Sequence, residues 1–306
     1  MARKRETLAR KLGFAEGERI AIVHCDDIGM CHAANIGAFE ALDAGPATCG
    51  SVMVPCPWFE EAATMARARP DVDLGVHLTL NAEWSHYRWG PVLGASAVPS
   101  LVGADGCFFK TTAEVLTQAE PEEVDRELRA QVDRALGAGI DVTHLDAHMG
   151  TAMLPPLHEI YVQLAIDYAL PVFFFRPDEG LLARLGLGPV ASLAGEIAQR
   201  LERHGIPVLD GFDSDSLSFK EGEGAAHNRA RLHGLSEGIH YLICHPAAAG
   251  EELSAITDSA HCREFERVFY GGPEGLDALA QEEVRTLGMR VLREFVRSKT
   301  STRTGE

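Results

Sequence analysis

The sequence lacks any uninterrupted run of about 18 apolar residues, the length that a transmembrane helix needs. Its basic first segment, MARKRETLARKLGF, also lacks the apolar centre of a signal peptide. We therefore expect a cytoplasmic protein that has no membrane partner.

Cysteine pairs are missing as well. The seven cysteines are an odd number, and no two of them show CxxC spacing. A disulfide framework normally has an even count, and a zinc ribbon has such pairs. We expect free thiols in a reducing compartment.

Basic residues are scarce, because 28 Lys and Arg stand against 45 Asp and Glu, for a net charge of −17. Nucleic acids and anionic membranes select basic surfaces, so a nucleic-acid partner is not expected. The glycine-rich phosphate loops GxGxxG and GxxxxGK[ST] do not follow any predicted strand, which argues against a nucleotide-binding fold.

The sequence does contain a regular alternation of short apolar runs and longer amphipathic segments. Strands are predicted at 19–25, 47–55, 72–80, 140–148, 170–177, 206–212 and 239–246. Helices are predicted at 32–43, 58–69, 121–139, 156–169, 190–204, 226–237, 259–270 and 279–297. Apolar strands that alternate with helices indicate parallel βαβ units in an α/β protein. Seven strands favour a closed or nearly closed barrel.

We expect one domain over residues 1–306, since α/β barrels commonly have this length. The Pro- and Gly-rich segment 81–120 is predicted to be a long insertion after the third strand, forming a lid or a substrate wall. Its Trp84, Tyr87 and Trp89 are candidates either for stacking on a bound substrate or for anchoring the loop. The tail from about 299 to 306 is predicted to be disordered.

Ionisable residues gather where the predicted strands end, which is the edge that forms the active sites of α/β barrels. In the HLDAH segment, His144, Asp146 and His148 are two residues apart and share one face of a strand. As a helix, the segment would instead show zincin-like spacing, but the Glu of HExxH is missing and β-branched residues favour a strand. Either geometry presents two imidazoles to one metal ion.

The acid pair Asp26–Asp27 ends the first strand. One of the two carboxylates, with His77 and His148, makes a metal set that leaves positions open for water and substrate. The other carboxylate is then a candidate general base. A helix N-cap is the competing interpretation. The spacing alone leaves the roles of the two aspartates open.

Four motifs, HCDDIG, GVHLTL, THLDAHMG and ICHP, occur in an order and spacing that resemble the YdjC/ChbG family of carbohydrate deacetylases, over about residues 18–270. The resemblance implies a distorted (β/α)7-type barrel related to the polysaccharide deacetylases. It also implies one divalent metal ion, Zn²⁺ or Mg²⁺, a homodimer, and removal of an acetyl group from an N-acetylated amino sugar or short chitooligosaccharide.

By position, the resemblance assigns the general base to Asp26 and the metal ligands to Asp27, His77 and His148. It assigns the general acid to His245.

Three further residues take supporting roles. The resemblance implies that Arg176 lies near the site, where it orients the catalytic Asp or binds substrate, while His144 and Asp146 are expected to orient the metal ligands. The sequence departs from the family pattern at Cys25, Ile28, Met149–Gly150 and Ala247. The metal set is intact, so the departures concern only the contacts to the sugar beyond its acetyl group.

Two other functions stay open at this point. One is a metal-dependent amidase or other hydrolase that acts on a non-sugar substrate, such as a phosphoester. The other is a non-catalytic sugar-binding relative. A phosphoester site usually has more cationic residues, and pure binding does not need Asp26 and His245 together.

Overall fold

Strand β1 (Arg19–Ile28) lies at the centre of a seven-stranded parallel sheet in the computed structural model, which describes residues 7–176 and 191–303. One edge of β1 pairs with β6 (Gly238–Cys244). Its other edge pairs first with β7 (Val284–Thr286) and then with β2 (Cys49–Val52). The strand order is β4-β3-β2-β1-β6-β5, with β3 at Leu74–Leu78, β4 at Val142–Ala147 and β5 at Gly211–Asp213.

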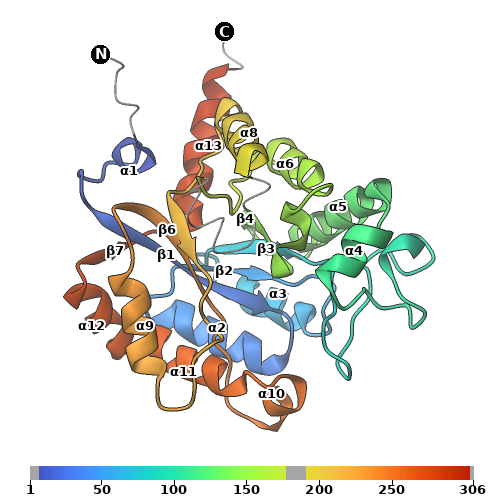
Figure 1. Cartoon of the computed structure of the whole chain (residues 1–306), viewed down its shortest axis with the longest axis horizontal. Coiled ribbons are helices and arrows are strands. Elements are labelled where there is room, and N and C mark those ends of the chain that lie inside the picture. The colour runs from blue at the N-terminus through green and yellow to red at the C-terminus, as the bar shows by residue number, and fades with distance from the viewer. Residues whose placement is uncertain (1–6, 177–190, 304–306) are drawn as a thin grey trace.

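Two isolated parallel bridges join the outer edges of this sheet. Leu145 of β4 pairs with Val172, and Phe175 pairs with Leu209, two residues before β5. The sheet therefore curls into a barrel (Figure 1), which confirms the predicted α/β barrel. The strand predicted at 170–177 contributes only these bridges within the described residues, and its residue 177 lies outside them.

Helices surround the barrel (Figure 1), and most lie where the sequence predicts them. The longer ones before β7 are α2 (His32–Ala44), α3 (Phe59–Arg67), α5 (Pro121–Gly137), α6 (His158–Asp167), α8 (Ala191–Arg203), α9 (Gly224–His233) and α11 (Ala260–Tyr270). Shorter ones are α1 (Leu8–Lys11), α4 (Thr112–Gln118), α10 (Glu251–Ile256) and the 3₁₀ helices η1 (Pro99–Leu101) and η2 (His148–Met153). In α5, Val124, Leu128 and Val132 recur at every fourth position and are fully buried against the sheet layer.

The single helix predicted at 279–297 is wrong. This region forms α12 (Pro273–Gln281), strand β7 and α13 (Met289–Arg303). Glu283 has a left-handed backbone with φ of 52°, which ends the helical path, and Val284–Thr286 then pair with the start of β1. Helix α13 includes residues 299–303 of the tail predicted to be disordered, and residues 304–306 lie outside the described residues.

The barrel interior is apolar near the amino ends of the strands and polar near their carboxyl ends. Along β1, Ile20 and Ile22 pack in one buried cluster with Met289 and Leu292 from the start of α13. The next residues on the same face of β1 are His24 and Asp26. The polar groups therefore lie at the carboxyl ends of the strands, as predicted.

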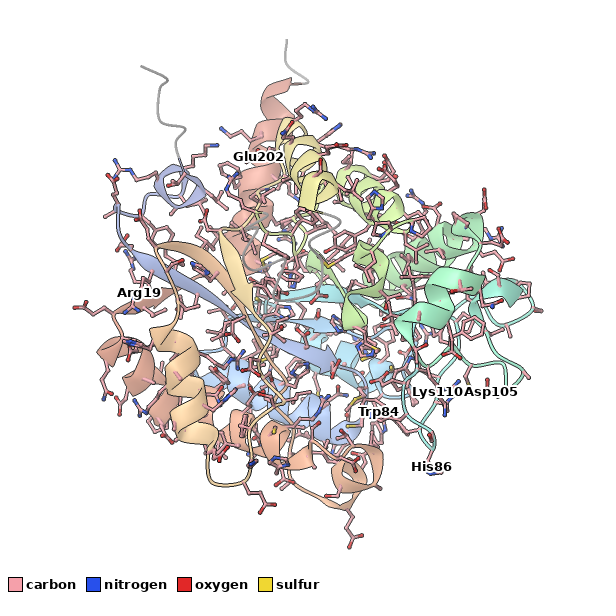
Figure 2. The ribbon with its side chains drawn as sticks, in the orientation of Figure 1. Arg19, Trp84, His86, Asp105, Lys110 and Glu202 are labelled. Carbon is pink, nitrogen blue, oxygen red and sulfur yellow. The ribbon has the colours of Figure 1, made fainter. Side chains whose placement is uncertain are left out.

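The insertion after β3 is held in place by hydrogen bonds. Arg88 donates to the carbonyl oxygens of Ala82 and Phe108 at 2.5 and 2.8 Å, and the Trp89 indole donates to Asn81 O at 2.8 Å. Glu127 of α5 accepts from two backbone amides of the insertion. Figure 2 shows its Trp84, His86, Asp105 and Lys110 together at one edge of the molecule. Among the described residues, no helix has both the length and the apolarity that crossing a membrane requires.

Candidate active site

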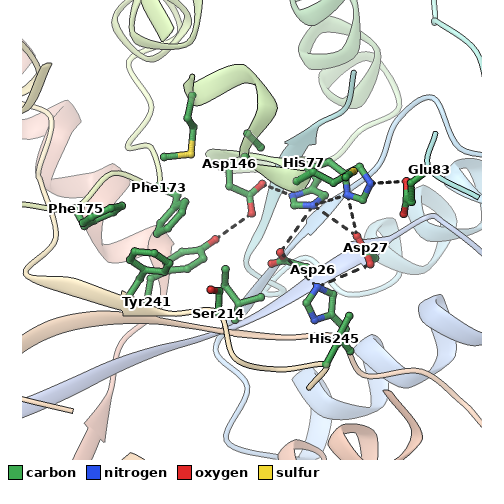
Figure 3. A pocket seen from close by; sticks show the side chains of 18 of the residues that line it. Asp26, Asp27, His77, Glu83, Asp146, Phe173, Phe175, Ser214, Tyr241 and His245 are labelled. Carbon is green, nitrogen blue, oxygen red and sulfur yellow. Dashed lines mark hydrogen bonds and ion pairs between the residues drawn. The ribbon is translucent and has the colours of Figure 1, made fainter. Parts of the chain in front are cut away.

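Asp26 and Asp27 both face the same pocket at the carboxyl end of β1 (Figure 3). Neighbouring residues on a regular strand point to opposite faces. Here the pairing of β1 with β2 shifts register between Cys25 and Ile28, and Asp27 has a left-handed φ of 64°. Asp tolerates this conformation better than most residues, and irregularities of this kind re-aim side chains at functional sites. The backbone thus brings two adjacent carboxylates to one site.

Asp27, His77 and His148 form a group whose ligand atoms all lie within 4.8 Å of one another. His148 Nδ1 is 3.3 Å from Asp27 Oδ1 and 3.3 Å from His77 Nε2, and Asp27 Oδ1 is 3.6 Å from His77 Nε2. Ligand bonds of about 2.0–2.1 Å in a tetrahedral site put neighbouring ligand atoms about 3.3 Å apart. The spacing of the group therefore fits one small divalent cation.

Each of these three residues has one ligand atom left for a metal ion. Asp27 Oδ1 is buried and accepts no hydrogen bond, while its Oδ2 accepts one from Arg263 at 2.8 Å. His77 uses Nδ1 to bind Asp146 at 2.9 Å, and His148 uses Nε2 to bind Glu83 at 3.0 Å. A buried acceptor without a partner costs free energy. The donor set consequently matches a metal site in both geometry and chemistry.

Asp146 bonds Nδ1 of His77, the ring nitrogen that does not belong to the metal group. Its carboxylate also accepts hydrogen bonds from Ser51 at 2.9 Å and Tyr241 at 3.2 Å. Burial opposes ionisation, but His77 and the other nearby imidazoles outweigh it and lower the pKa of Asp146. A carboxylate on the far nitrogen fixes the tautomer and orientation of a metal-binding histidine.

Charges also surround the other two members of the group. Burial alone lowers the pKa of His148, but the carboxylates of Glu83 and Asp27 raise it to about 10. Burial opposes ionisation of Asp27, whereas Arg263, His148 and His245 hold its pKa well below the usual range. Because a metal ligand must be a neutral imidazole, binding of a cation here must release the proton of His148.

His245 lies across the pocket from the metal group. Its Nε2 is 3.9 Å from Asp26 Oδ2 and 4.0 Å from Asp27 Oδ2. Its Nδ1 contacts Ser216 Oγ at 2.8 Å, and Glu266 accepts hydrogen bonds from both the Ser216 hydroxyl and the His245 amide at 2.7 Å. Burial lowers the pKa of His245 to about 4. The residue therefore presents Nε2 to the pocket from a fixed ring.

The pocket is a cavity of about 550 Å³. Six of the eight predicted site residues line it, namely Asp26, Asp27, His77, Asp146, His148 and His245. The aromatic side chains in its wall are Phe173, Phe175, Phe212 and Tyr241, shown in part in Figure 3. The insertion aromatics Trp84, Tyr87 and Trp89 are not among the lining residues, and pack against the core cluster instead.

Two predicted residues lie elsewhere. His144 is fully buried behind the pocket, where it bonds His24 at 2.8 Å. Arg176 does not line the cavity and instead pairs with Glu202 at 2.9 Å and Asp210 at 3.7 Å. Alternation along the extended segment explains this: Phe173 and Phe175 face the pocket, so Arg176 points the other way.

Replacing Arg176 with alanine is expected to leave turnover and bound metal unchanged within about twofold. The side chain is partly exposed, and exposed ion pairs contribute about 0–1 kcal/mol to stability. Steady-state kinetics and metal analysis of the purified variant check this. A large loss of kcat with normal metal content would place Arg176 back at the reaction.

Sequence reasoning missed the residues that hold the site from distant segments. Glu83 lies in the insertion, Ser51 on β2 and Arg263 on α11, and none belongs to one of the four motifs. Arg263 and Asp27 are 236 residues apart in the sequence, so no local sequence pattern predicts their hydrogen bond.

Several known proteins resemble this chain over most of its length. The family model described as YdjC-like protein matches residues 20–296. A carbohydrate deacetylase from Thermus thermophilus is 35% identical over 288 residues, which cover 94% of this chain and 98% of the relative. One from Listeria welshimeri is 30% identical over 276 residues, 89% of this chain and 99% of the relative. The crystal structure of a proposed cellobiose-phosphate cleavage protein from Enterococcus faecalis has the same fold, with a TM-score of 0.72 and 24% identity, covering 90% of this chain and 99% of that chain.

Proposed function

This chain belongs to the YdjC-like family, and we propose that it is a carbohydrate deacetylase whose reaction depends on a divalent metal ion held by Asp27, His77 and His148. One observation carries the metal proposal. The buried Oδ1 of Asp27 has no hydrogen-bond partner and faces one imidazole nitrogen from each of the two histidines. The proposed ion is Zn²⁺, because the spacing matches a tetrahedral site, with Mg²⁺ as the alternative.

A cation bound there supplies a Lewis acid that polarises the acetamide carbonyl and lowers the pKa of water beside it. The chain supplies the proton transfers. Asp26, whose Oδ2 is 3.9 Å from His77 Nε2, is placed to take the proton of the attacking water. His245 Nε2, 3.9 Å from the same oxygen, is placed to receive that proton and pass it to the leaving amine.

The proposed substrate is an N-acetylated amino sugar or a short oligosaccharide of such sugars. The apolar faces of sugar rings pack on aromatic side chains, and Phe173, Phe175, Phe212 and Tyr241 form such a wall beside the metal group. The amide of the acetyl group would then lie between Asp26 and His245.

The experiment that tests this function combines metal analysis with acetate release from a panel of N-acetylated sugars. We expect about one divalent ion per chain and release of one acetate per amine formed. Bound metal with no acetate from any sugar, but turnover of a non-sugar amide or phosphoester, would replace the deacetylase assignment. Sugar binding without turnover would make the chain a binding protein.

Replacing Glu83 with glutamine is expected to weaken metal binding by about 10–100-fold, the usual effect of altering a residue that orients a ligand. Glutamine keeps the length of the side chain but removes the charge that acts on His148 Nε2. Competition with a chromophoric chelator measures the affinity. Glu61→Gln is the control, because Glu61 binds His32 and Asn35 outside the cavity. Equal affinities for E83Q and the wild type would contradict the prediction.

A further inference from the structure

The cavity at the carboxyl ends of the strands has a polar half and an apolar half. Figure 3 shows Asp27 and Glu83 on one side of the cavity and Phe173 and Phe175 on the other. The apolar half is lined from three elements that follow one another around the barrel: η2 after β4, the segment before Arg176, and β5 with the loop after it. The proposed reaction takes place in the polar half, so the apolar half is left to bind the part of the substrate that does not react.

Four aliphatic side chains in the apolar half remain accessible to a ligand. We call them the apolar rim, which consists of Met149, Met153, Leu154 and Leu217. Met149 is 49% exposed and the other three are half-buried, whereas Phe173 in the aromatic wall is buried. Apolar side chains that stay accessible together inside a cavity are typical of a surface that a ligand covers.

The backbone of Met149 is unusual for an exposed apolar residue. Its φ is 54° and that of Gly150 is 67°, so two successive residues are left-handed. This conformation is uncommon for residues other than glycine, and such outliers gather at functional sites. The half-exposed side chain of Met149 buries too little apolar surface within the chain to account for this conformation. The sequence also departs from the family pattern at these two positions. Both observations favour a contact between Met149 and a ligand.

Polar partners for a second sugar are scarce in the cavity. Tyr241 donates its hydroxyl to Asp146, and Arg263 donates to Asp27. Among the described residues that line the cavity, Ser214 then has the only polar side chain outside the reacting groups and the side chains bonded to them. A second acetylated sugar brings an amide and several hydroxyls, and burying these without partners costs free energy. An anionic group fits no better, because Arg263 is the only Lys or Arg among these lining residues and already pairs with a carboxylate.

We propose that the apolar rim binds an apolar, uncharged aglycone, so that the preferred substrate is an N-acetylated amino sugar whose anomeric oxygen carries an alkyl or aryl group in place of a second sugar. This inference rests on the proposed function, which makes acetyl the acyl group and leaves the sugar to carry the apolar group. The sugar ring packs on the aromatic wall, and the aglycone covers Met149 and its neighbours. Methionine side chains are flexible and polarisable, so the two in the rim adapt to groups of different shape.

Hydrolysis of the methyl and butyl glycosides of N-acetylglucosamine, compared with its N,N′-diacetyl disaccharide, tests this preference. Each methylene group that leaves water contributes a factor of about four. We therefore expect kcat/KM for the butyl glycoside to exceed that for the methyl glycoside by about tenfold or more, and also to exceed that for the disaccharide. Equal values for the two glycosides, or a higher value for the disaccharide, would overturn the inference. So would faster hydrolysis of an N-butanoyl than of an N-acetyl methyl glycoside, because the rim would then bind the acyl chain.

Met149→Asn tests whether the rim is the source of the preference. Asparagine tolerates the left-handed backbone but removes the apolar side chain. The ratio of kcat/KM for the butyl glycoside to that for the methyl glycoside is expected to fall about fivefold, the effect of losing part of the buried apolar area. Leu93→Asn is the matched control, because Leu93 is 40% exposed in the insertion and does not line the cavity. This control should keep the ratio of the wild type. An unchanged ratio in Met149→Asn would contradict the assignment of the rim.

Binding of the deacetylated products separates this inference from the proposed function. Calorimetric titration of the full chain with methyl and butyl glucosaminide needs no turnover, and we expect the butyl compound to bind about tenfold more tightly. If that ratio is found but no acetylated sugar is hydrolysed, the proposed function fails and the rim still binds an apolar group. If acetate is released but the two compounds bind equally, the proposed function stands and the inference about the rim is wrong.

Discussion

Asparagine in place of Asp26 is expected to lower kcat by about 10²–10⁴-fold, the usual contribution of a general base. The amide has nearly the same shape as the carboxylate but cannot take up the proton of the attacking water. The metal group consists of Asp27, His77 and His148, so we expect the variant to bind metal as tightly as the wild type does. Acetate-release kinetics at known metal stoichiometry measure both quantities.

The result for metal binding decides between the roles of the two aspartates. If Asp26→Asn loses its metal ion together with its activity, Asp26 is a ligand, and the assignment of base and ligand must be exchanged. If it keeps full activity, neither proton transfer nor metal binding needs Asp26. Binding of an uncleaved substrate analogue should stay within a few fold, because Asp26 acts on the water.

The fold was largely predictable because its local signals are strong. Apolar runs at 19–25 and 239–246 become the central strands β1 and β6. Val124, Leu128 and Val132 of α5 are buried as their spacing predicts, whereas Leu136, the next residue of the same series, is 45% exposed. The missed strand β7 is three residues long and is stabilised by pairing with residues 19–21, more than 260 positions earlier. No local pattern marks such a strand.

The sequence predicts which residues gather at the candidate site, but it does not predict how their side chains are oriented there. Strand alternation places His144 and Asp146 on the barrel side with His148, and the structure brings Asp27, His77 and His148 within reach of one ion. The separate places of Asp26 and Asp27 depend on the left-handed backbone of Asp27 and the register shift beside it, which the sequence does not reveal.

The position of Arg176 could not be predicted for a related reason. Along an extended segment, a shift of one residue decides whether a side chain faces the pocket or points away from it. The resemblance to a family pattern does not tell which residues of the segment take the pocket side. Phe173 and Phe175 take the pocket side, and the buried cation at the site is Arg263 from α11.

Asparagine in place of Asp27 is expected to reduce metal affinity by more than about 100-fold, beyond the usual effect of altering a residue that only orients a ligand. Asn accepts a left-handed backbone as readily as Asp does, so the φ of 64° adds no strain to the variant. Its carbonyl can still accept the hydrogen bond from Arg263, although the charge that pairs with this buried guanidinium is lost.

The pair Asp26→Asn and Asp27→Asn is therefore a matched comparison of the same chemical change at adjacent positions. We expect Asp27→Asn to lose turnover at low metal concentration and regain part of it as metal is added, whereas added metal should not rescue Asp26→Asn. His77→Ala should resemble Asp27→Asn without altering the contact to Arg263, which separates loss of the metal ion from loss of the ion pair. Circular dichroism checks that each variant is folded. Tight metal binding in both Asp27→Asn and His77→Ala would show that the ion lies elsewhere, and the proposed metal centre would then be wrong.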